Sequence, residues 1–168
     1  MDIQTFENEV LKIERLLYHV SWSLLSNQED CADAVQEALA RAWEKRHTLQ
    51  SRKAFRNWLV QILRNVCNDA LRRRSKQRFA PLEEDALQSL TSEPDGYSTI
   101  EMLQGLSPEH RLVVVLHYLE GYKIRDIAQM LGVPQGTIKT RLMKARIYLR
   151  IALPARADIH GGINDEKK

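Results

Sequence analysis

The sequence predicts an all-α protein of two small helical domains joined by a flexible linker. Apolar residues recur three and four positions apart along most of the chain, as on the buried face of a helix. This pattern stops between about residues 76 and 98, where prolines, a glycine and acidic residues collect, and then resumes in a basic stretch with turn signals. The chain has 168 residues and is 43% hydrophobic, enough for one medium core or two small ones. We expect a first domain over residues 1–75, a linker over 76–98, a second domain over 99–153 and a frayed tail over 154–168.

A first amphipathic helix is expected from about residue 3 to residue 25. Its apolar residues share one face: Phe6, Val10, Ile13, Leu17, Val20 and Leu24. Ser26 and Glu29 match an S-x-x-E capping box, which predicts that a second helix begins there and runs to about residue 46. The side of that helix opposite its apolar residues carries Asp33, Gln36 and Glu37. Taken alone, such an acidic face is ordinarily solvated surface.

Residues 47–53 are polar and predict a loop, and the strongest amphipathic segment of the chain follows. Its buried stripe consists of Phe55, Trp58, Leu59, Ile62, Leu63, Cys67, Ala70 and Leu71. Its opposite face carries arginine and amide side chains, at Arg56, Asn57, Gln61, Arg64, Asn65 and Asn68. Together with the basic run that ends the segment, this face suits single-stranded DNA, because amides can bond bases and cations can hold phosphates.

A helix-turn-helix is predicted between residues 106 and 150, after a short helix at 99–104. Ser107 and Pro108 mark a helix start, and Gly121 and Gly132 supply the turns that follow the first two helices. The expected inward residues of those two helices are Leu112, Val115, Leu116 and Leu119, then Ile124, Ile127, Ala128 and Leu131. Pro134 starts the last helix, whose inner face carries Ile138, Leu142, Ala145 and Leu149.

The outer face of the last helix carries Lys139, Thr140, Met143 and Lys144. A basic face in this place enters the major groove of DNA, where lysine can donate to guanine and threonine can bond a base or touch a methyl group. Arg141 and Arg146 are expected to hold phosphates or neighbouring parts of the fold. The net charge of +3 is modest, but basic residues cluster at 72–78 and 139–150, which suggests two contacts with nucleic acid.

Several classes of protein find no support in the sequence. No P-loop, G-x-S-x-G motif or metal-ligand cluster is present, so we expect no enzyme, no cofactor and no metal. Cys31 and Cys67 fall on apolar helix faces and are expected to be buried thiols. The N-terminal residues do not form a signal peptide and no run is long and apolar enough for stable membrane insertion, so a cytoplasmic location is expected.

The run LSPEHRLVVVLHYLEGYKIRDIAQMLGVPQGTIKTRLMKAR resembles the C-terminal promoter-binding region of bacterial sigma factors, particularly the extracytoplasmic-function (ECF) group of the sigma-70 family. The resemblance implies binding to the minus-thirty-five promoter element, with Lys139, Thr140, Met143 and Lys144 at base-contacting positions. Lys123 stands where relatives usually have a capping serine, which should weaken the start of the helix that follows it.

Two N-terminal segments resemble the same family. DCADAVQEALARAW is similar to the segment that docks on the clamp helices of the RNA polymerase largest subunit, and this implies core-polymerase contacts by Asp33, Gln36 and Glu37. FRNWLVQILRNVCNDALRRR resembles the segment that melts promoter DNA and reads the minus-ten element. By this resemblance residues 47–53 hold a flipped base, and the DNA contacts come from Lys53, Arg56, Asn57, Gln61, Arg64 and Asn65.

The resemblance implies a sigma factor that binds core RNA polymerase, directs it to promoters and promotes strand opening. Its expected partners are core polymerase, through the clamp helices and the flap of the second-largest subunit, promoter DNA and an anti-sigma factor. A second hypothesis stays open at this stage. A helix-turn-helix alone could also belong to a transcriptional regulator, with the N-terminal helices serving for dimerisation or sensing.

Overall fold

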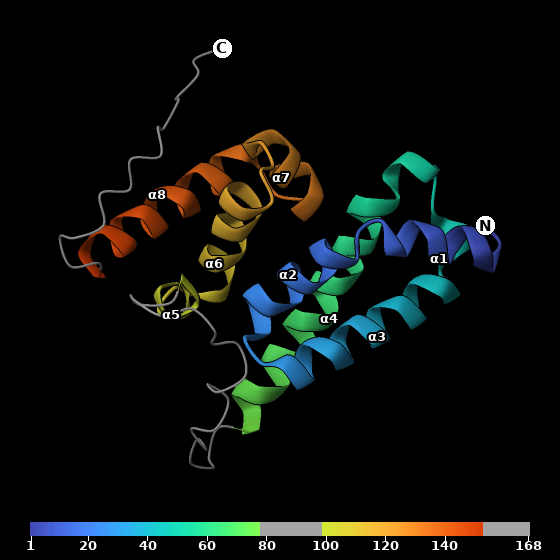
Figure 1. Cartoon of the computed structure of the whole chain (residues 1–168), viewed down its shortest axis with the longest axis horizontal. Coiled ribbons are helices and arrows are strands. Elements are labelled where there is room, and N and C mark those ends of the chain that lie inside the picture. The colour runs from blue at the N-terminus through green and yellow to red at the C-terminus, as the bar shows by residue number, and fades with distance from the viewer. Residues whose placement is uncertain (78–98, 153–168) are drawn as a thin grey trace.

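The structure of the chain is a computed structural model, and the residues it describes are 1–77 and 99–152. Every regular element in these two ranges is helical, and this confirms the all-α prediction. Figure 1 shows two groups of helices, α1 to α4 and α5 to α8, packed against each other. The predicted linker, from residue 78 onward, and the predicted tail over 154–168 lie outside the described residues.

The first group consists of α1 (Ile3–Leu11), α2 (Glu14–Leu25), α3 (Gln28–Glu44) and α4 (Phe55–Gln77). The last three pack side by side around one core, as Figure 1 shows. Among the fully buried residues of this core are Val20, Leu24, Leu59 and Leu63. Short α1 extends this core, because the ring of Phe6 lies 5.4 Å from that of Trp43 and 5.6 Å from that of Phe55, both edge-on.

Two predictions about the start of the chain were wrong. The expected single helix over residues 3–25 is interrupted at Lys12 and Ile13, where the Ile13 N–H bonds Val10 O instead of continuing the helical ladder. The expected capping box at Ser26 also fails, because Ser26 ends α2 in the left-handed conformation (φ 55°). The N-cap of α3 is the neighbouring Asn27, whose side chain accepts from the Asp30 N–H at 3.1 Å.

The segment between α3 and α4 is irregular, with short 3-10 turns at Arg46–Thr48 and Arg52–Ala54. Helix α4 then continues to Gln77, past the boundary expected at residue 75. Its basic end lies along α3, where Arg73 pairs with Glu37 at 4.0 Å and Arg74 pairs with Asp30. These ion pairs attach the last turns of α4 to the first domain.

The second group consists of α5 (Thr99–Gln104), α6 (Pro108–Val114), a π turn (Val115–Leu119), α7 (Ile124–Leu131) and α8 (Gln135–Ala152). Ser107 occupies the predicted N-cap position, but its hydroxyl bonds the ring of His110 at 2.8 Å rather than a backbone N–H. Gly121 and Gly132 adopt positive φ, as their turns require. Lys123 is the N-cap of α7, and its side chain makes no capping hydrogen bond, as the absence of a serine at this position predicted.

Because of the π turn, the prediction of one core residue was wrong. The Glu120 N–H bonds Val115 O at 3.0 Å, five residues back, which widens the turn and changes the direction of the residues in it. Leu116 stays buried, but Leu119, expected on the inner face, is 44% exposed. The other inward residues predicted for α7 and α8 are buried or packed against the core.

The two groups of helices share an interface, with α2 against α6 and the π turn, and α4 against α7. At its centre lies Arg111 of α6, which is buried. Its guanidinium donates to the carbonyls of Leu103 and Leu106, at 2.9 Å each, and across the interface to the Ser23 carbonyl at 3.0 Å and the Ser26 hydroxyl. Burial lowers the pKa of Arg111. None of the helices described is long and apolar enough to cross a membrane.

Candidate nucleic-acid interface

Helix α8 presents the predicted polar face to solvent. Ile138, Leu142 and Ala145 are buried against the two preceding helices of the domain. The residues on the opposite side are all exposed: Lys139, Thr140, Met143 and Lys144. The left-handed turn at Gly132 ends α7 and allows α8 to follow at an angle, and the buried apolar stripe of α8 decides which of its faces points outward. The fold brings these four side chains together as expected.

The two arginines predicted to flank this face are bound by their own domain. Arg141 donates to a carboxylate oxygen of Glu109 at 2.8 Å, and Arg146 donates to the Tyr118 hydroxyl at 2.8 Å. Glu109 lies in the first turn of α6, where the helix dipole also favours a negative charge. In this structure both arginines therefore hold α8 against its neighbours rather than face solvent freely.

One residue beside the α8 face was not predicted. A hollow next to α8 is lined by His110, Gly136, Thr137, Thr140, Arg141 and Lys144. His110 comes from α6, and its Nδ1 is occupied by the hydroxyl of Ser107. No local signal in the sequence could have placed this imidazole beside α8, because the two segments meet only in the folded domain.

The polar face of α4 is only partly exposed. Lys53, Arg56, Gln61 and Asn65 are exposed and Asn57 is half-buried, whereas the side chain of Arg64 is only 18% exposed. The Arg64 guanidinium donates to the Leu131 carbonyl at 3.0 Å and to both carboxylate oxygens of Glu109 at 3.3 Å each. The second domain thus occupies a residue that the sequence assigned to DNA.

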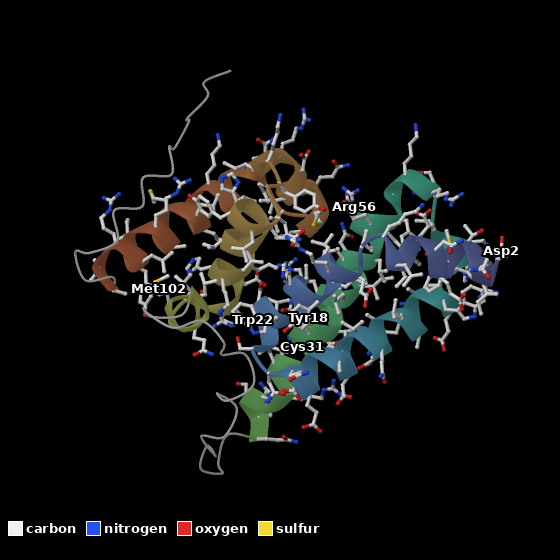
Figure 2. All side chains as sticks on the ribbon, viewed as in Figure 1. Asp2, Tyr18, Trp22, Cys31, Arg56 and Met102 are labelled. Carbon is white, nitrogen blue, oxygen red and sulfur yellow. The ribbon has the colours of Figure 1, made fainter. Side chains whose placement is uncertain are left out.

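Other parts of the same face also lie close to α7. The guanidinium of Arg56 stands 5.8 Å from the centre of the Tyr122 ring, and Figure 2 shows Arg56 where the start of α4 approaches α7. The Gln61 amide nitrogen lies 3.7 Å from the position that a Cβ on Gly132 would occupy. A polar hollow between the two domains here is lined from one side by Arg52, Lys53, Arg56 and Asn57 and from the other by Tyr122, Asp126, Gln129 and Met130.

The acidic face predicted on α3 is partly paired within the domain. Asp33 and Gln36 are exposed. Glu37 is about half-buried and pairs with Arg41, one helical turn on, and with Arg73 of α4. A partner protein would therefore meet two exposed polar residues and a carboxylate already held in position.

Cys31 and Cys67 are buried and free. Burial raises the pKa of Cys31, and it raises the pKa of Cys67 to about 12, with a smaller contribution from Cys31 itself. Such thiols are protonated and poor nucleophiles at neutral pH. Within the described ranges no cluster of three or more His, Cys, Asp or Glu side chains could hold a metal ion.

The chain matches known families in both halves. Residues 10–77 match sigma-70 region 2, and residues 98–149 match sigma-70 region 4. The chain is also 32% identical over 150 residues to the ECF RNA polymerase sigma factor SigM of Mycobacterium tuberculosis, an alignment that covers 88% of this chain and 76% of SigM. The chain belongs to the ECF group of the sigma-70 family. This ECF sigma factor is 27% identical over 140 residues to SigV of Bacillus subtilis, covering 81% and 83% of the two chains.

Solved structures of sigma factors have the same fold as this ECF sigma factor. The sigma factor RpoE, crystallised with the anti-sigma factor NepR from Bartonella quintana, has a TM-score of 0.76 and 25% identity, over 92% of this chain and 100% of that one. The fold is also that of CnrH, solved with the cytosolic domain of CnrY, with a TM-score of 0.66 and 21% identity over 93% and 92% of the two chains.

Proposed function

We propose that this ECF sigma factor binds core RNA polymerase, directs it to specific promoters and promotes strand opening, with no catalytic chemistry of its own. The observation that carries the proposal is the exposed face of α8, formed by Lys139, Thr140, Met143 and Lys144, above a buried apolar stripe in a helix-turn-helix. It lies in one chain with a second polar helix face, on α4, suited to single-stranded DNA.

The α8 face is proposed to read the minus-thirty-five element from the major groove. Lys139 and Lys144 can donate to guanine, Thr140 can bond a base edge, and Met143 offers an apolar contact to a thymine methyl group. Arg141 and Arg146 fix the orientation of this helix through Glu109 and Tyr118.

The α4 face is proposed to bind the opened minus-ten element. Lys53, Arg56 and Arg64 would hold phosphates, while the amides of Asn57, Gln61 and Asn65 would bond base edges. Residues 47–53 would form the wall of a pocket for one flipped base. The irregular backbone of this segment, with its two 3-10 turns, supports that role because it leaves polar groups outside a regular helix.

Protein partners are assigned to other surfaces. Asp33, Gln36 and Glu37 are proposed to contact the clamp helices of the polymerase, and the second domain to contact its flap. Core polymerase and chromosomal DNA share the cytoplasm, which is the proposed location. The likeness to RpoE, whose structure contains an anti-sigma factor, supports an anti-sigma partner for this chain. The domain limits 1–75 and 99–153 remain part of the proposal.

Run-off transcription tests this function directly. Purified core polymerase and promoter fragments from the source genome are incubated with and without the protein, and specific start sites are expected only when it is present. Binding to DNA without core association or initiation would overturn the proposal in favour of a transcriptional regulator.

A charge reversal separates the core contact from DNA binding. Glu37→Lys is expected to weaken association with core polymerase and to leave binding to promoter duplex unchanged. Glu44→Lys, on an exposed residue of the same helix, is the matched control and should change neither.

A further inference from the structure

Ser107 stands at the start of α6 but does not cap this helix. A serine in the N-cap position ordinarily accepts a hydrogen bond from a backbone N–H of the first turn, which stabilises the helix by about 1 kcal/mol. The Ser107 hydroxyl makes no such bond and instead bonds Nδ1 of His110 at 2.8 Å. The helix therefore lacks a common stabilising contact, and the hydroxyl orients an imidazole instead.

The bond to Ser107 uses Nδ1 of His110 and leaves Nε2 as the ring nitrogen that can bind a ligand. A neutral imidazole carries one N–H, and its other nitrogen is an acceptor. When the Ser107 hydroxyl donates to Nδ1, the ring hydrogen lies on Nε2, which becomes a donor. An anion beside the ring favours this tautomer, because an anion can accept a hydrogen bond from Nε2 but cannot donate one.

His110 lines a hollow of about 440 Å³ between α6 and α8. The other walls of this hollow belong to α8 and consist of Gly136, Thr137, Thr140, Arg141 and Lys144. There is open space beside Gly136, since a Cβ added to it would contact nothing within 4 Å. Thr140 and Lys144 also belong to the α8 face that is proposed to read bases. The hollow therefore borders that face directly.

The charges around the hollow favour an anion. Lys144 is exposed, whereas Arg141 is only 21% exposed and pairs with Glu109 at 2.8 Å. The Glu109 carboxylate also pairs with Arg64 at 3.3 Å, so two guanidinium groups oppose its charge. An anion in the hollow would meet a free lysine, a paired arginine and the imidazole, and the one carboxylate nearby is already neutralised.

The dimensions of duplex DNA place phosphates on both sides of α8. The major groove is about 12 Å wide, and a helix with its side chains is about 10–12 Å across. A helix that lies in the groove is therefore flanked by the backbones of both strands. With the α8 face against base edges, one of these backbones runs along the edge of α8 where the hollow lies.

We propose that His110 is a DNA-contacting residue, which donates from Nε2 to a phosphate oxygen of this strand, and that Ser107 orients it. The inference rests on the proposed binding of promoter duplex by the α8 face. It adds a contact from α6, outside the helix-turn-helix pair of α7 and α8. A phosphate contact carries no base preference of its own but fixes the register of α8 in the groove.

The test compares three substitutions of His110 in the full chain. His110→Gln places an amide N–H where Nε2 lies, His110→Asn reaches only as far as Nδ1, and His110→Leu has no donor. Fluorescence anisotropy at pH 8, where an ordinary imidazole is neutral, measures affinity for a randomised duplex and for a promoter duplex identified by run-off transcription. The Leu and Asn variants should bind both duplexes about fivefold more weakly, and the Gln variant should retain most of the affinity.

The choice of duplex and the salt dependence identify the group that His110 contacts. A phosphate contact weakens binding equally for both duplexes, and a loss confined to the promoter duplex would overturn the phosphate assignment in favour of a base. A neutral donor releases no counterion, so the salt dependence of binding should be unchanged in His110→Leu. A slope reduced by about one would reveal a charged contact and overturn the neutral donor.

Ser107→Ala tests the orienting role of the hydroxyl. The substitution removes no capping bond, so urea denaturation should show little change in stability. It should weaken duplex binding about twofold in the wild-type protein, because the imidazole is no longer held in one tautomer and orientation. It should have no further effect in His110→Gln, whose amide carries a fixed donor. An equal loss in both backgrounds would mean a merely structural role for Ser107.

The control is Gln4→Leu, which adds the same apolar side chain at an exposed position of α1 and should leave duplex affinity unchanged. If the wild-type protein initiates transcription and the Leu and Asn variants bind duplex as tightly as it does, the contact is overturned and the proposed function stands. If the wild-type protein fails to initiate while these variants lose affinity and His110→Gln retains it, the contact holds and the sigma role is what fails.

Discussion

The outer face of α8 and the outer face of α4 are both polar and basic, yet the folded chain leaves the first open and covers part of the second. Each lies opposite a buried apolar stripe. The stripe of α8 packs within its own domain. Helix α4 packs on α2 and α3 from one side and receives α7 on the other. The spacing of apolar residues along a helix thus determines which face enters the core. It does not determine whether the polar face contacts solvent or another domain.

The difference fits the two kinds of DNA that the faces are proposed to bind. Duplex DNA is the normal state of a chromosome, and an exposed α8 can search it continuously. The opened strands of a promoter occur only once that promoter melts, and a face that binds any single strand would also bind unrelated single-stranded nucleic acid. The packing of α7 on α4 leaves less of this face open to such competition.

Arg111→Ala should have the largest effect of these substitutions, because Arg111 lies in the interface between the two domains. It removes a buried guanidinium from carbonyls of its own domain and from Ser23 and Ser26 of the other, so unfolding should become easier by about 3 kcal/mol. Urea denaturation measures this loss. Arg111→Lys keeps the charge but not the planar guanidinium, so its stability should lie between those of the wild-type protein and Arg111→Ala. A loss below about 1 kcal/mol would mean that water replaces the guanidinium readily.

Lys144→Ala and Arg64→Ala sharpen the comparison at the level of DNA. Lys144→Ala should weaken promoter duplex binding by about 1–3 kcal/mol, without affecting core association, because it removes an exposed cation that is proposed to contact a base or phosphate. Arg64→Ala should leave duplex binding of the free protein unchanged. Fluorescence anisotropy with duplex probes measures DNA binding, and pull-down of core polymerase measures core association. Equal loss of core binding in Lys144→Ala and Glu37→Lys would contradict the division of labour.

Gly132→Ala should have a smaller effect. The residue has φ +66°, a conformation that costs an alanine about 1 kcal/mol. The added methyl group would meet the Gln61 amide at 3.7 Å, an ordinary contact, so the interface itself should tolerate it. Thermal unfolding measures the cost. A destabilisation much above this value would indicate that the turn fits α4 more closely than the distance implies.

The titration of the Cys67 thiol should lower stability only at alkaline pH. Its pKa is about 12 in the fold, against an ordinary 9.0, so the folded state keeps a proton that the unfolded state releases between these values. Stability from this group is fully present below pH 9.0 and is lost as the pH rises toward 12. Urea unfolding at increasing pH should show a flatter alkaline decline in Cys67→Ala. An equal slope would assign the decline to other groups.

Much of the fold could be predicted from the sequence, because apolar spacing is a local property. The three- and four-residue spacing of apolar residues predicted the buried faces of α4 and α8, although Val60 and Val66, which are buried, were not among the residues predicted for α4. Gly132 placed the turn between α7 and α8. The predictions that failed concern positions whose conformation depends on residues far away in the sequence. Ser26 looked like an N-cap, but it ends α2 in a left-handed conformation beside Arg111 of the other domain, and the cap passes to Asn27.

The candidate site divides in the same way. The outer face of α8 follows from helical geometry alone, so its four residues could be predicted. The engagement of Arg64 by Glu109 and Leu131 could not, because it depends on how two domains far apart in the sequence pack. His110 was missed for the same reason. Whether a polar face is exposed depends on tertiary packing. The spacing of apolar residues predicts only which face of the helix is buried in its own core.

The π turn at Val115–Leu119 has a consequence for how the length of the chain can vary. A π turn contains one residue more than an α turn, so it is equivalent to a single-residue insertion absorbed within a helix. Loss of one codon from this segment would restore an ordinary α turn and keep Leu112 in the core upstream. It would also rotate Tyr118 away from Arg146, the pair that holds α8 at this point. The extra residue is thus what places Tyr118, in the turn after α6, beside Arg146 of α8.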